Sequence, residues 1–407
     1  METISFLKEE KFLMEETLRR MVKEEKRGCF QELDKSKLVV IYGLRGTGKT
    51  TLLAQKYFDD GMEKNKRLAI HGEHLSIAGY KIKDLIRSLK YVNSDGYLFI
   101  DEITKLDNWA EELKVLSDIY PNLRIIVTGS SAVDLQNARR TLARRAFFIN
   151  LKPLTFNEFL KIKYKKSIPQ FDPFSKDPLT NALKVELDAR EKLEDIEKVM
   201  NEYKRMNLPY LIDNSPSTLL DVLERIIYED IGKSSSFSEE ILDKFKPLLR
   251  LLALSEKTSY DNLSRDIGVG KGTVIKMLDL LIKANVIKTI YPYAIGKGTI
   301  RKEPKYLFTS PTIREVLLSF LGEKERMIGL TREDLFAMHI DELFYLKTGP
   351  DYIWKDALFE IGDRGKTSEQ FRFVEEKKRK YIIHDGLEVT GNEIIKLPFY
   401  IFLTYFK

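Results

Sequence analysis

Short apolar runs alternate with longer amphipathic stretches between residues 37 and 151. The runs are LVVIY, RLAI, YLFI, RIIVT and FFINL, and each has the length and residue types of a buried strand. Strands that alternate with amphipathic helices are typical of a parallel sheet with crossover helices. The pattern therefore predicts an α/β domain whose helices lie at about residues 50–60, 82–90, 109–120 and 131–142.

The pattern changes after residue 165. Three closely spaced prolines follow, and then a helix with favourable i,i+4 charge pairs between residues 184 and 206. Residues 244–308 show three amphipathic helices and two strand-like runs, VIKTIY and KYLF, around a glycine-containing tip, which is the order of a winged helix. The predicted domains are an α/β domain (1–165), a helical lid or linker (166–240), a winged helix (241–322) and a small α/β domain (323–407).

A glycine-rich loop follows the first apolar run and precedes a predicted helix. Its sequence, GLRGTGKTT, has the Walker A spacing. Glycines let backbone N–H groups converge on phosphate oxygens, and the positive end of the following helix favours the same anion. Lys49 is expected to reach the β and γ phosphates, and the Thr50 hydroxyl is expected to ligate Mg²⁺. The predicted nucleotide-binding residues are Gly43, Leu44, Arg45, Gly46, Thr47, Gly48, Lys49, Thr50 and Thr51.

Two carboxylates end the apolar run YLFI. Sites in open α/β sheets lie at the carboxyl ends of strands, so Asp101 is predicted to hold magnesium and Glu102 to polarise the attacking water. The next residues, Thr104 to Asp107, match the guanine-recognition pattern formally. That pattern belongs on a later strand in GTPases, so its position here favours ATP over GTP.

A third strand ends in the hydroxyl-rich sequence TGSS at residues 128–131. A hydroxyl there would orient the water or sense the γ phosphate, and Thr128 is preferred to Ser130. A turn-forming role is the alternative. One further strand, RLAI, intervenes, so we expect the strand of Thr128 to lie between the Walker A and Walker B strands, as in additional-strand ATPases.

Four arginines cluster before FFINL, at positions 139, 140, 144 and 145. A charge-stabilising arginine from this cluster is expected to reach a γ phosphate in its own or a neighbouring subunit. Arg144 and Arg145 are the preferred residues for that role. A solvated helix end explains the cluster nearly as well.

Composition narrows the class of protein only a little. The chain has 68 basic and 62 acidic residues, and a net charge of +6 permits an acidic partner without demanding one. A single cysteine, Cys29, excludes an internal disulfide framework. The amino terminus lacks the apolar core of a signal peptide, and the apolar tail at 397–406 is too short to span a bilayer. These features predict a cytoplasmic protein without membrane contact.

Several segments together resemble an archaeal and bacterial family of AAA-type ATPases with many uncharacterised members. The segments are GLRGTGKTTLL, FIDEITKLDNW, IIVTGSSAVDL and LARRAFFINLKPLTFNEFL. The resemblance continues through LLDVLERIIYEDI to KYLFTSPTIREVLLSFLG and so covers most of the chain. It implies an ATPase core, a winged-helix domain, and a carboxyl-terminal domain similar to restriction endonucleases that is often inactive.

The sequence departs from this family at two places. Residues 143–145 read Ala-Arg-Arg where the family usually has a Gly-Arg pair. Either Arg144 or Arg145 could therefore be the charge-stabilising arginine, or arginine finger. Residues 207–209 read Asn-Leu-Pro where a Gly-Gly-x-Pro turn is common. The second departure weakens the transfer of details of the lid.

Two further activities are open on the sequence. Nuclease chemistry would use Glu375 and Lys377 with Asp356 or Asp363 to hold a metal, although Glu-x-Lys spacing is frequent by chance in so charged a chain. Binding of double-stranded DNA would use the third helix of the winged-helix segment and its wing. The basic and polar residues concerned are Lys271, Thr273, Lys276, Lys297, Arg301 and Lys302.

The main prediction is magnesium-dependent hydrolysis of ATP, coupled to a rearrangement that involves the winged helix. The alternatives are an ATP-controlled DNA-binding switch in which hydrolysis is incidental, and a nuclease that uses the carboxyl-terminal domain. A protein partner or a homo-oligomer is compatible with the sequence. The substrate acted upon and the oligomeric state do not follow from it.

Overall fold

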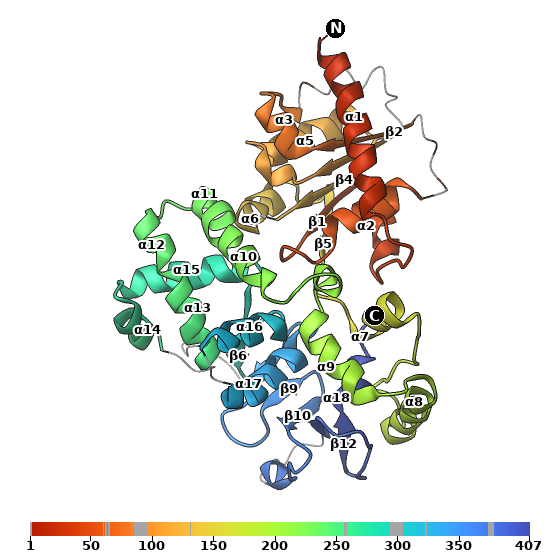
Figure 1. Ribbon diagram of the computed structural model, residues 1–407, viewed down its shortest axis with the longest axis vertical. Coiled ribbons are helices and arrows are strands. Elements are labelled where there is room, and N and C mark those ends of the chain that lie inside the picture. Colours follow the sequence, from red (N-terminus) through yellow and green to blue (C-terminus); the bar gives the residue numbers. More distant parts are fainter. Residues whose placement is uncertain are drawn as a thin grey trace. The chain divides into compact units, whose positions relative to one another are not determined.

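The computed structural model describes residues 2–407 except 60, 62, 64–65, 83, 85–95, 131, 256–258, 294–303, 322–323 and 373–377. The chain forms two compact units (Figure 1). The first consists of residues 1–151 and 228–236, and the second of residues 152–227 and 237–407. The four-domain division predicted from the sequence stays a prediction.

The first unit is built on a parallel sheet of five strands. Its strands are β1 (Leu38–Tyr42), β2 (Arg67–His71), β3 (Tyr97–Asp101), β4 (Arg124–Gly129) and β5 (Ala146–Asn150). Their order in the sheet is β2-β3-β4-β1-β5, and all neighbouring pairs are parallel. The predicted parallel sheet is confirmed, and β4 lies between β3 and β1 as the sequence predicted.

Helices cover both faces of this sheet because its strands are apolar on both sides. Residues Val39 and Ile41 pack with one set of helices, and Leu38 and Val40 pack with the other. The first set is α1 (Glu2–Met21) and α2 (Lys49–Tyr57), and the second is α3 (Gly72–Ile77), α5 (Trp109–Ile119) and α6 (Ala132–Thr141). Leu7, near the start of α1, packs with the second set. The helix predicted at residues 82–90 lies mostly outside the described residues.

The second unit opens with helices. They are α7 (Phe156–Phe159), the π-helix η4 (Leu160–Tyr164), α8 (Pro178–Lys192), α9 (Ile196–Met206), the 3-10 helix η5 (Pro209–Ile212) and α10 (Thr218–Arg225). Aspartates cap the two long ones, because Asp177 accepts from the Thr180 N–H and Asp195 from the Lys198 N–H. The chain then passes through the π-helix η6 (Ile226–Ile231) and α11 (Gly232–Ser234).

The segment predicted as a winged helix contains helices and a strand pair in the expected order. They are α12 (Glu239–Asp243), α13 (Phe245–Leu254), α14 (Tyr260–Ile267), α15 (Lys271–Lys283), and the antiparallel strands β6 (Ile287–Pro292) and β7 (Lys305–Phe308). Val274, Met277, Leu278 and Leu281 of α15 are buried, as the periodicity predicted. The tip between the strands lies outside the described residues, and the winged-helix interpretation remains a proposal.

The rest of the second unit extends this strand pair into one sheet. Its elements are α16 (Pro311–Leu321), α17 (Lys324–Ala337), β8 (Phe344–Tyr345), β9 (Tyr352–Trp354), β10 (Ala357–Gly362), η7 (Glu369–Phe371), β11 (Arg379–His384), β12 (Ile394–Pro398) and α18 (Phe399–Leu403). The strand order is β12-β11-β10-β9-β8-β6-β7. Strands β10, β11 and β12 are parallel, so their carboxyl ends share one edge. None of the described helices combines the length and apolar character needed to cross a bilayer.

A buried ion pair joins α16 to α17. The side chains of Arg314 and Asp334 are fully buried, and Arg314 Nη2 donates to Asp334 Oδ1 at 3.0 Å. Arg314 Nη1 also donates to the backbone oxygens of Leu252 and Ala253, while Asp334 accepts from the Phe308 N–H. One guanidinium therefore ties together α13, α16, α17 and β7.

We expect Arg314→Met to lower the free energy of unfolding of the second unit by about 3–5 kcal/mol, because Asp334 would be left buried and unpaired. Chemical denaturation followed by circular dichroism measures this change. Arg205→Met is the control, since Arg205 is 61% exposed in its pair with Glu315 and should cost at most about 1 kcal/mol. Equal losses in the two variants would contradict the role of the buried pair.

Two carboxyl groups lie close together beside β10. The Asp351 N–H donates to Glu360 Oε2 at 3.0 Å, and Asp351 Oδ2 accepts from the Ile361 N–H at 2.9 Å. Burial and the neighbouring Glu360 carboxylate raise the pKa of Asp351 from 3.8 to about 6. Ionising Asp351 thus costs more in the folded than in the unfolded chain, so stability falls as pH rises from 3.8 through 6.

We expect Asp351→Asn to stabilise the second unit by roughly 1–2 kcal/mol at neutral pH, because the amide removes that cost and still accepts the Ile361 N–H. At a pH below the unfolded-state value of 3.8 the gain should vanish. Thermal unfolding of both proteins across this range measures the difference. Asp363→Asn, at an exposed position, is the control, and a gain independent of pH would contradict the account.

Candidate nucleotide site

The predicted phosphate loop connects β1 to α2. Gly46 and Gly48 have φ angles of 86° and 89°, in the left-handed region that suits glycine, and Gly48 is the residue before the first turn of α2. A Cβ at Gly43 would lie 2.4 Å from the Leu151 carbonyl oxygen. The glycines are therefore required by the path of this backbone, which brings the N-terminus of α2 to the carboxyl edge of the sheet.

Lys49 is buried against the loop that it follows. Its Nζ donates to the carbonyl oxygens of Gly43 at 3.1 Å and Leu44 at 3.2 Å. Burial lowers the pKa of Lys49, and the carboxylates of Glu102 and Asp101 oppose this shift. The hydrogen bonds of the Lys49 ammonium group thus go to backbone carbonyl oxygens and not to a carboxylate. This suits the binding of a polyphosphate.

Asp101 ends β3 next to the start of α2. The Thr50 hydroxyl donates to Asp101 Oδ2 at 2.9 Å, and the Thr128 hydroxyl donates to Asp101 Oδ1. The Glu102 N–H in turn donates to Thr128 Oγ1 at 3.0 Å. Thr128 is fully buried and contacts both acidic residues. Its predicted role in orienting water or sensing phosphate stays a prediction.

Glu102 lies directly after the strand, in a left-handed conformation with φ 52°. Its carboxylate accepts the Ser130 hydroxyl at 2.9 Å. Ser130, from the end of β4, is therefore the hydroxyl that touches the predicted base, whereas the sequence analysis preferred Thr128. The common hydroxyl-rich strand end was the only signal in the sequence that pointed to Ser130.

The pair of Thr50 and Asp101 fits a magnesium ion. A hydroxyl and a carboxylate are hard oxygen donors, and Mg²⁺ in nucleotide sites takes few protein ligands and completes its shell with phosphate oxygens and water. No cluster of three or more His, Cys, Asp or Glu occurs among the described residues. Thr50 and Asp101 are thus the residues that would hold such an ion.

The remaining loop residues hold the loop's shape. The Thr47 hydroxyl donates to the Leu44 oxygen at 2.9 Å, and Arg27 Nη1 donates to the Thr47 oxygen at 2.8 Å. Leu44 is buried, and Thr51 is a half-buried residue in the first turn of α2. Arg27 was not predicted, because nothing in the sequence around it marks contact with a loop twenty residues away.

Arg45 leaves the loop and contacts residues far along the chain. Its Nε and Nη2 donate to the two carboxylate oxygens of Asp230 at 2.8 and 2.7 Å, and Nη2 also donates to Glu229 at 3.0 Å. The hydrogen bond with Asp230 raises the pKa of Arg45 further. Both acidic residues belong to the segment 228–236, which is part of the first unit. No pattern in the sequence indicates this contact.

The predicted finger arginines lie at the opposite edge of the sheet from the loop. Strands β1 and β5 are in register from Leu38 with Ala146 to Tyr42 with Asn150, so residues before Ala146 are about 13 Å from the loop end of β1. Arg145 pairs with Asp118, at 2.9 Å, near the end of α5. Arg144 is exposed, has φ 70°, and makes no hydrogen bond or ion pair within the described residues.

This placement speaks against action of Arg144 or Arg145 on the nucleotide of their own chain and leaves the neighbouring subunit as their proposed target. Arg139, by contrast, lies near the loop edge, where its guanidinium donates to the Tyr42 hydroxyl and stacks over Phe148 with 4.7 Å to the ring centroid.

Comparison with known proteins agrees with this site. Residues 35–160 match a family described as AAA domain, and residues 210–324 match a domain of unknown function (DUF8612). The uncharacterized protein MJ1637 of Methanocaldococcus jannaschii is 32% identical over 93% of this chain and 87% of its own length. The chain belongs to the family of this protein. Within it, residues 35–160 are similar to the AAA domain.

Two further proteins are similar to parts of the present chain. The uncharacterized protein MJ1544 of the same organism is 34% identical over 31% of this chain and 29% of its own length. Among solved structures, the Walker-type ATPase PABY2304 of Pyrococcus abyssi has a TM-score of 0.43 and 15% identity, and the similarity covers 71% of this chain and 93% of that protein.

The structure describes only some of the residues that the sequence suggested for DNA binding and for nuclease chemistry. Lys271, at the start of α15, pairs with Asp261 at 2.9 Å, while Lys276 is exposed and Thr273 half-buried. Asp356 Oδ2 lies 3.8 Å from Arg379 Nε, and the Asp363 carboxylate accepts from the Gly365 N–H. The other residues lie outside the described part of the chain, namely Lys297, Arg301, Lys302, Glu375 and Lys377.

Proposed function

We propose that this protein binds ATP with magnesium at the loop from Gly43 to Thr51 and hydrolyses it to ADP and phosphate. The observation that supports this most is the hydrogen-bonded series at the carboxyl edge of the sheet. It runs from Thr50 through Asp101 and Thr128 to the backbone of Glu102, and from the Glu102 carboxylate to Ser130. These contacts support the proposal of a hard-oxygen metal site and a carboxylate base beside the phosphate loop.

Each of these groups has a distinct task in the proposed reaction. The loop N–H groups and the Lys49 ammonium would hold the β and γ phosphates, and Thr50 with Asp101 would hold Mg²⁺, which neutralises charge on the transferring phosphate. Glu102 would accept a proton from the water that attacks the γ phosphorus, while the bond from phosphorus to the β-γ bridging oxygen breaks. The Ser130 hydroxyl would hold the Glu102 carboxylate in place for this step.

The contact of Arg45 supports a link between nucleotide and conformation. Arg45 lies within the phosphate loop, and the segment 228–236 that it binds continues into the second unit at both of its ends. A change in the loop on binding or hydrolysis would alter the bidentate ion pair with Asp230, which is 7% exposed. We infer that this segment passes the state of the nucleotide on to the rest of the chain.

We expect Asp230→Asn to weaken this link without abolishing nucleotide binding, because the amide keeps the shape of the side chain and loses its charge. Hydrogen exchange of residues 228–236, measured with ADP and with a non-hydrolysable ATP analogue, should differ in the native protein. In the variant we expect that difference to fall by at least about half, with affinity for the analogue changed by less than about fivefold. An unchanged difference in exchange would contradict the link.

An assay of ATP hydrolysis, with and without duplex DNA, tests the proposed function as a whole. Release of phosphate that depends on both protein and magnesium is the expected result. A rate that responds to duplex DNA at low salt would support the proposed winged helix as its DNA contact. Absence of hydrolysis under all these conditions would overturn the proposal.

A further inference from the structure

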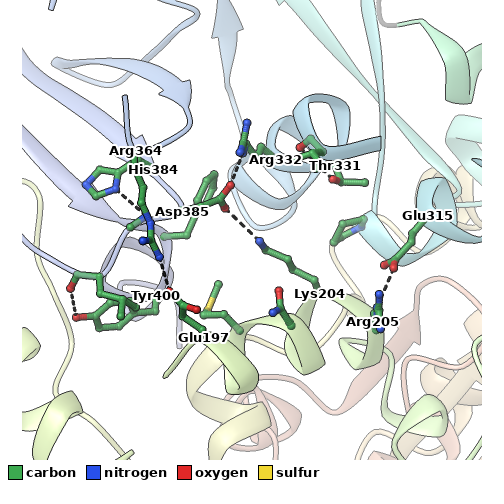
Figure 2. Close-up of a pocket in the computed structure, with 17 residues that line it drawn as sticks. Glu197, Lys204, Arg205, Glu315, Thr331, Arg332, Arg364, His384, Asp385 and Tyr400 are labelled. Carbon is green, nitrogen blue, oxygen red and sulfur yellow. Dashed lines mark hydrogen bonds and ion pairs between the residues drawn. The ribbon is translucent and has the colours of Figure 1, made fainter. Parts of the chain in front are cut away.

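A cavity of about 440 Å³ is lined by residues of the second unit alone (Figure 2). His384 and Asp385 bring the end of β11 to it, and Phe399 and Tyr400 follow β12. Helices α9, α16 and α17 supply its other walls. The cavity therefore opens at the carboxyl ends of parallel strands, which is where ligands of open α/β sheets bind.

The inner part of this cavity has more positive than negative charge. Asp385 accepts from Lys204 Nζ at 3.1 Å and also from Arg332 Nε, and Figure 2 shows both cations pointing toward this one carboxylate. The side chains of Lys204, Arg332 and Asp385 are 26, 16 and 24% exposed, so all three are only partly reached by water. One carboxylate for two cations leaves about one positive charge, which favours an anion here.

The rim of the cavity adds no negative charge to this balance. Arg364 donates to Glu197, and Arg205 donates to Glu315 at 2.8 Å, so each cation there has a carboxylate of its own (Figure 2). Among the described residues that line the cavity, four side chains are cationic and three are acidic. The excess positive charge thus belongs to the pair of Lys204 and Arg332.

His384 adds a neutral donor. Its Nδ1 accepts from the Gly386 N–H at 2.8 Å, which places the ring proton on Nε2. Burial lowers the pKa of His384, so the ring is neutral near pH 7. The residue is 7% exposed, and Nε2 makes no hydrogen bond with the described residues. The Nε2–H can therefore donate to a ligand acceptor.

Part of the cavity lining is apolar. Phe399 and Tyr400 are almost fully buried, and Met200 and Leu387 lie beside them on the cavity surface. The Tyr400 hydroxyl donates to the Leu387 carbonyl at 3.0 Å, so this polar atom is already satisfied. A ligand that fills the cavity would meet both charged donors and apolar surface.

We propose that this cavity binds a small molecule that carries a phosphate ester on an apolar or aromatic body. The ammonium of Lys204, the guanidinium of Arg332 and the Nε2–H of His384 are donors of three kinds, and a phosphate monoester offers three terminal oxygens to them. A neutral body would lie against Phe399 and Tyr400. The site is separate from the proposed ATP site and does not depend on it.

Phenyl phosphate is a suitable probe, with phenol as its neutral counterpart. We expect phenyl phosphate to bind in calorimetry and to shift the ¹⁵N resonances of His384, whereas phenol does neither. The same result is expected for the Lys49→Ala protein, which separates this cavity from the phosphate loop. Absence of a His384 shift at high phenyl phosphate, or an equal shift with phenol, would overturn the proposal.

Arg332→Gln tests the site itself. The variant leaves Asp385 paired with Lys204 and should weaken phenyl phosphate at least about tenfold, because the excess charge is lost. Arg205→Gln, at the rim, should change the affinity by less than about threefold. Equal affinity of the native protein and Arg332→Gln would overturn the proposal. If that variant does not fold, the proposal is tested by the shift of the His384 ¹⁵N resonances that phenyl phosphate, compared with phenol, causes in the native protein.

Discussion

The Lys49→Ala protein should show no measurable binding of MgATP. Lys49 is the ammonium group at the phosphate loop, and its Nζ lies 3.1 Å from the Gly43 oxygen. Alanine removes a charge-assisted contact to the β and γ phosphates inside a buried site, so we expect a loss of at least about 100-fold in affinity. Calorimetric titration of MgATP into the native and variant proteins measures this loss.

Lys35→Ala provides the matched control for this experiment. Lys35 is an exposed lysine of the same unit that pairs with Glu32 at 3.2 Å, and its removal should leave MgATP binding unchanged. Circular dichroism would verify that both variants fold. Retention of native affinity by the folded Lys49→Ala protein would contradict the assignment of the phosphate site.

Glu102→Gln should bind MgATP as the native protein does and fail to turn it over. The amide keeps the size of the side chain and can still accept the Ser130 hydroxyl, yet it cannot take a proton from water. Loss of a general base lowers a rate by about 10²- to 10⁴-fold, so steady-state phosphate release should fall to a few per cent or less. Affinity from calorimetry and turnover from phosphate release are measured on the same protein.

Glu111→Gln is the control, because Glu111 is an exposed carboxylate of the same unit, in the first turn of α5. Its turnover should match that of the native protein. Undiminished hydrolysis by Glu102→Gln would show that another group takes the proton. Loss of binding in that variant would show instead that Glu102 is needed to hold the nucleotide.

The sheet of the first unit could be predicted because its signals are local. Each buried strand is a continuous apolar run, and the glycine loop and the Asp-Glu pair follow two of those runs directly. The position of β4 between β1 and β3 also followed from the order of the motifs and is confirmed. The helix α3 was missed because its six residues are too few to show a period.

The rest of the site depends on contacts that no local pattern records. Arg45 and Asp230 are far apart in the sequence and are only two of 130 charged residues, so their pairing could not be chosen in advance. The choice between Thr128 and Ser130 depends on which hydroxyl faces Glu102 at the end of β4. The two residues are two positions apart, so alternation puts both on one face of a strand and does not distinguish them. The difference comes from the end of β4 at Gly129, which the sequence did not locate to one residue.

The seven-stranded sheet of the second unit was hidden for a related reason. Strands β8 and β9 have two and three residues, too few to show alternation. The strand pair β6 and β7 reads as the wing of a separate domain, yet Tyr291 and Pro292 pair with β8 in parallel. Such long-range pairing is set by tertiary packing rather than by the residues of either strand.

Calorimetric titration of the native protein with ATP, in the presence and absence of magnesium, tests the central claim most directly. The account predicts saturable binding to one site per chain, tighter with magnesium because Thr50 and Asp101 hold the ion together with the phosphates. Folded protein that shows no saturable association with ATP when magnesium is present would contradict it.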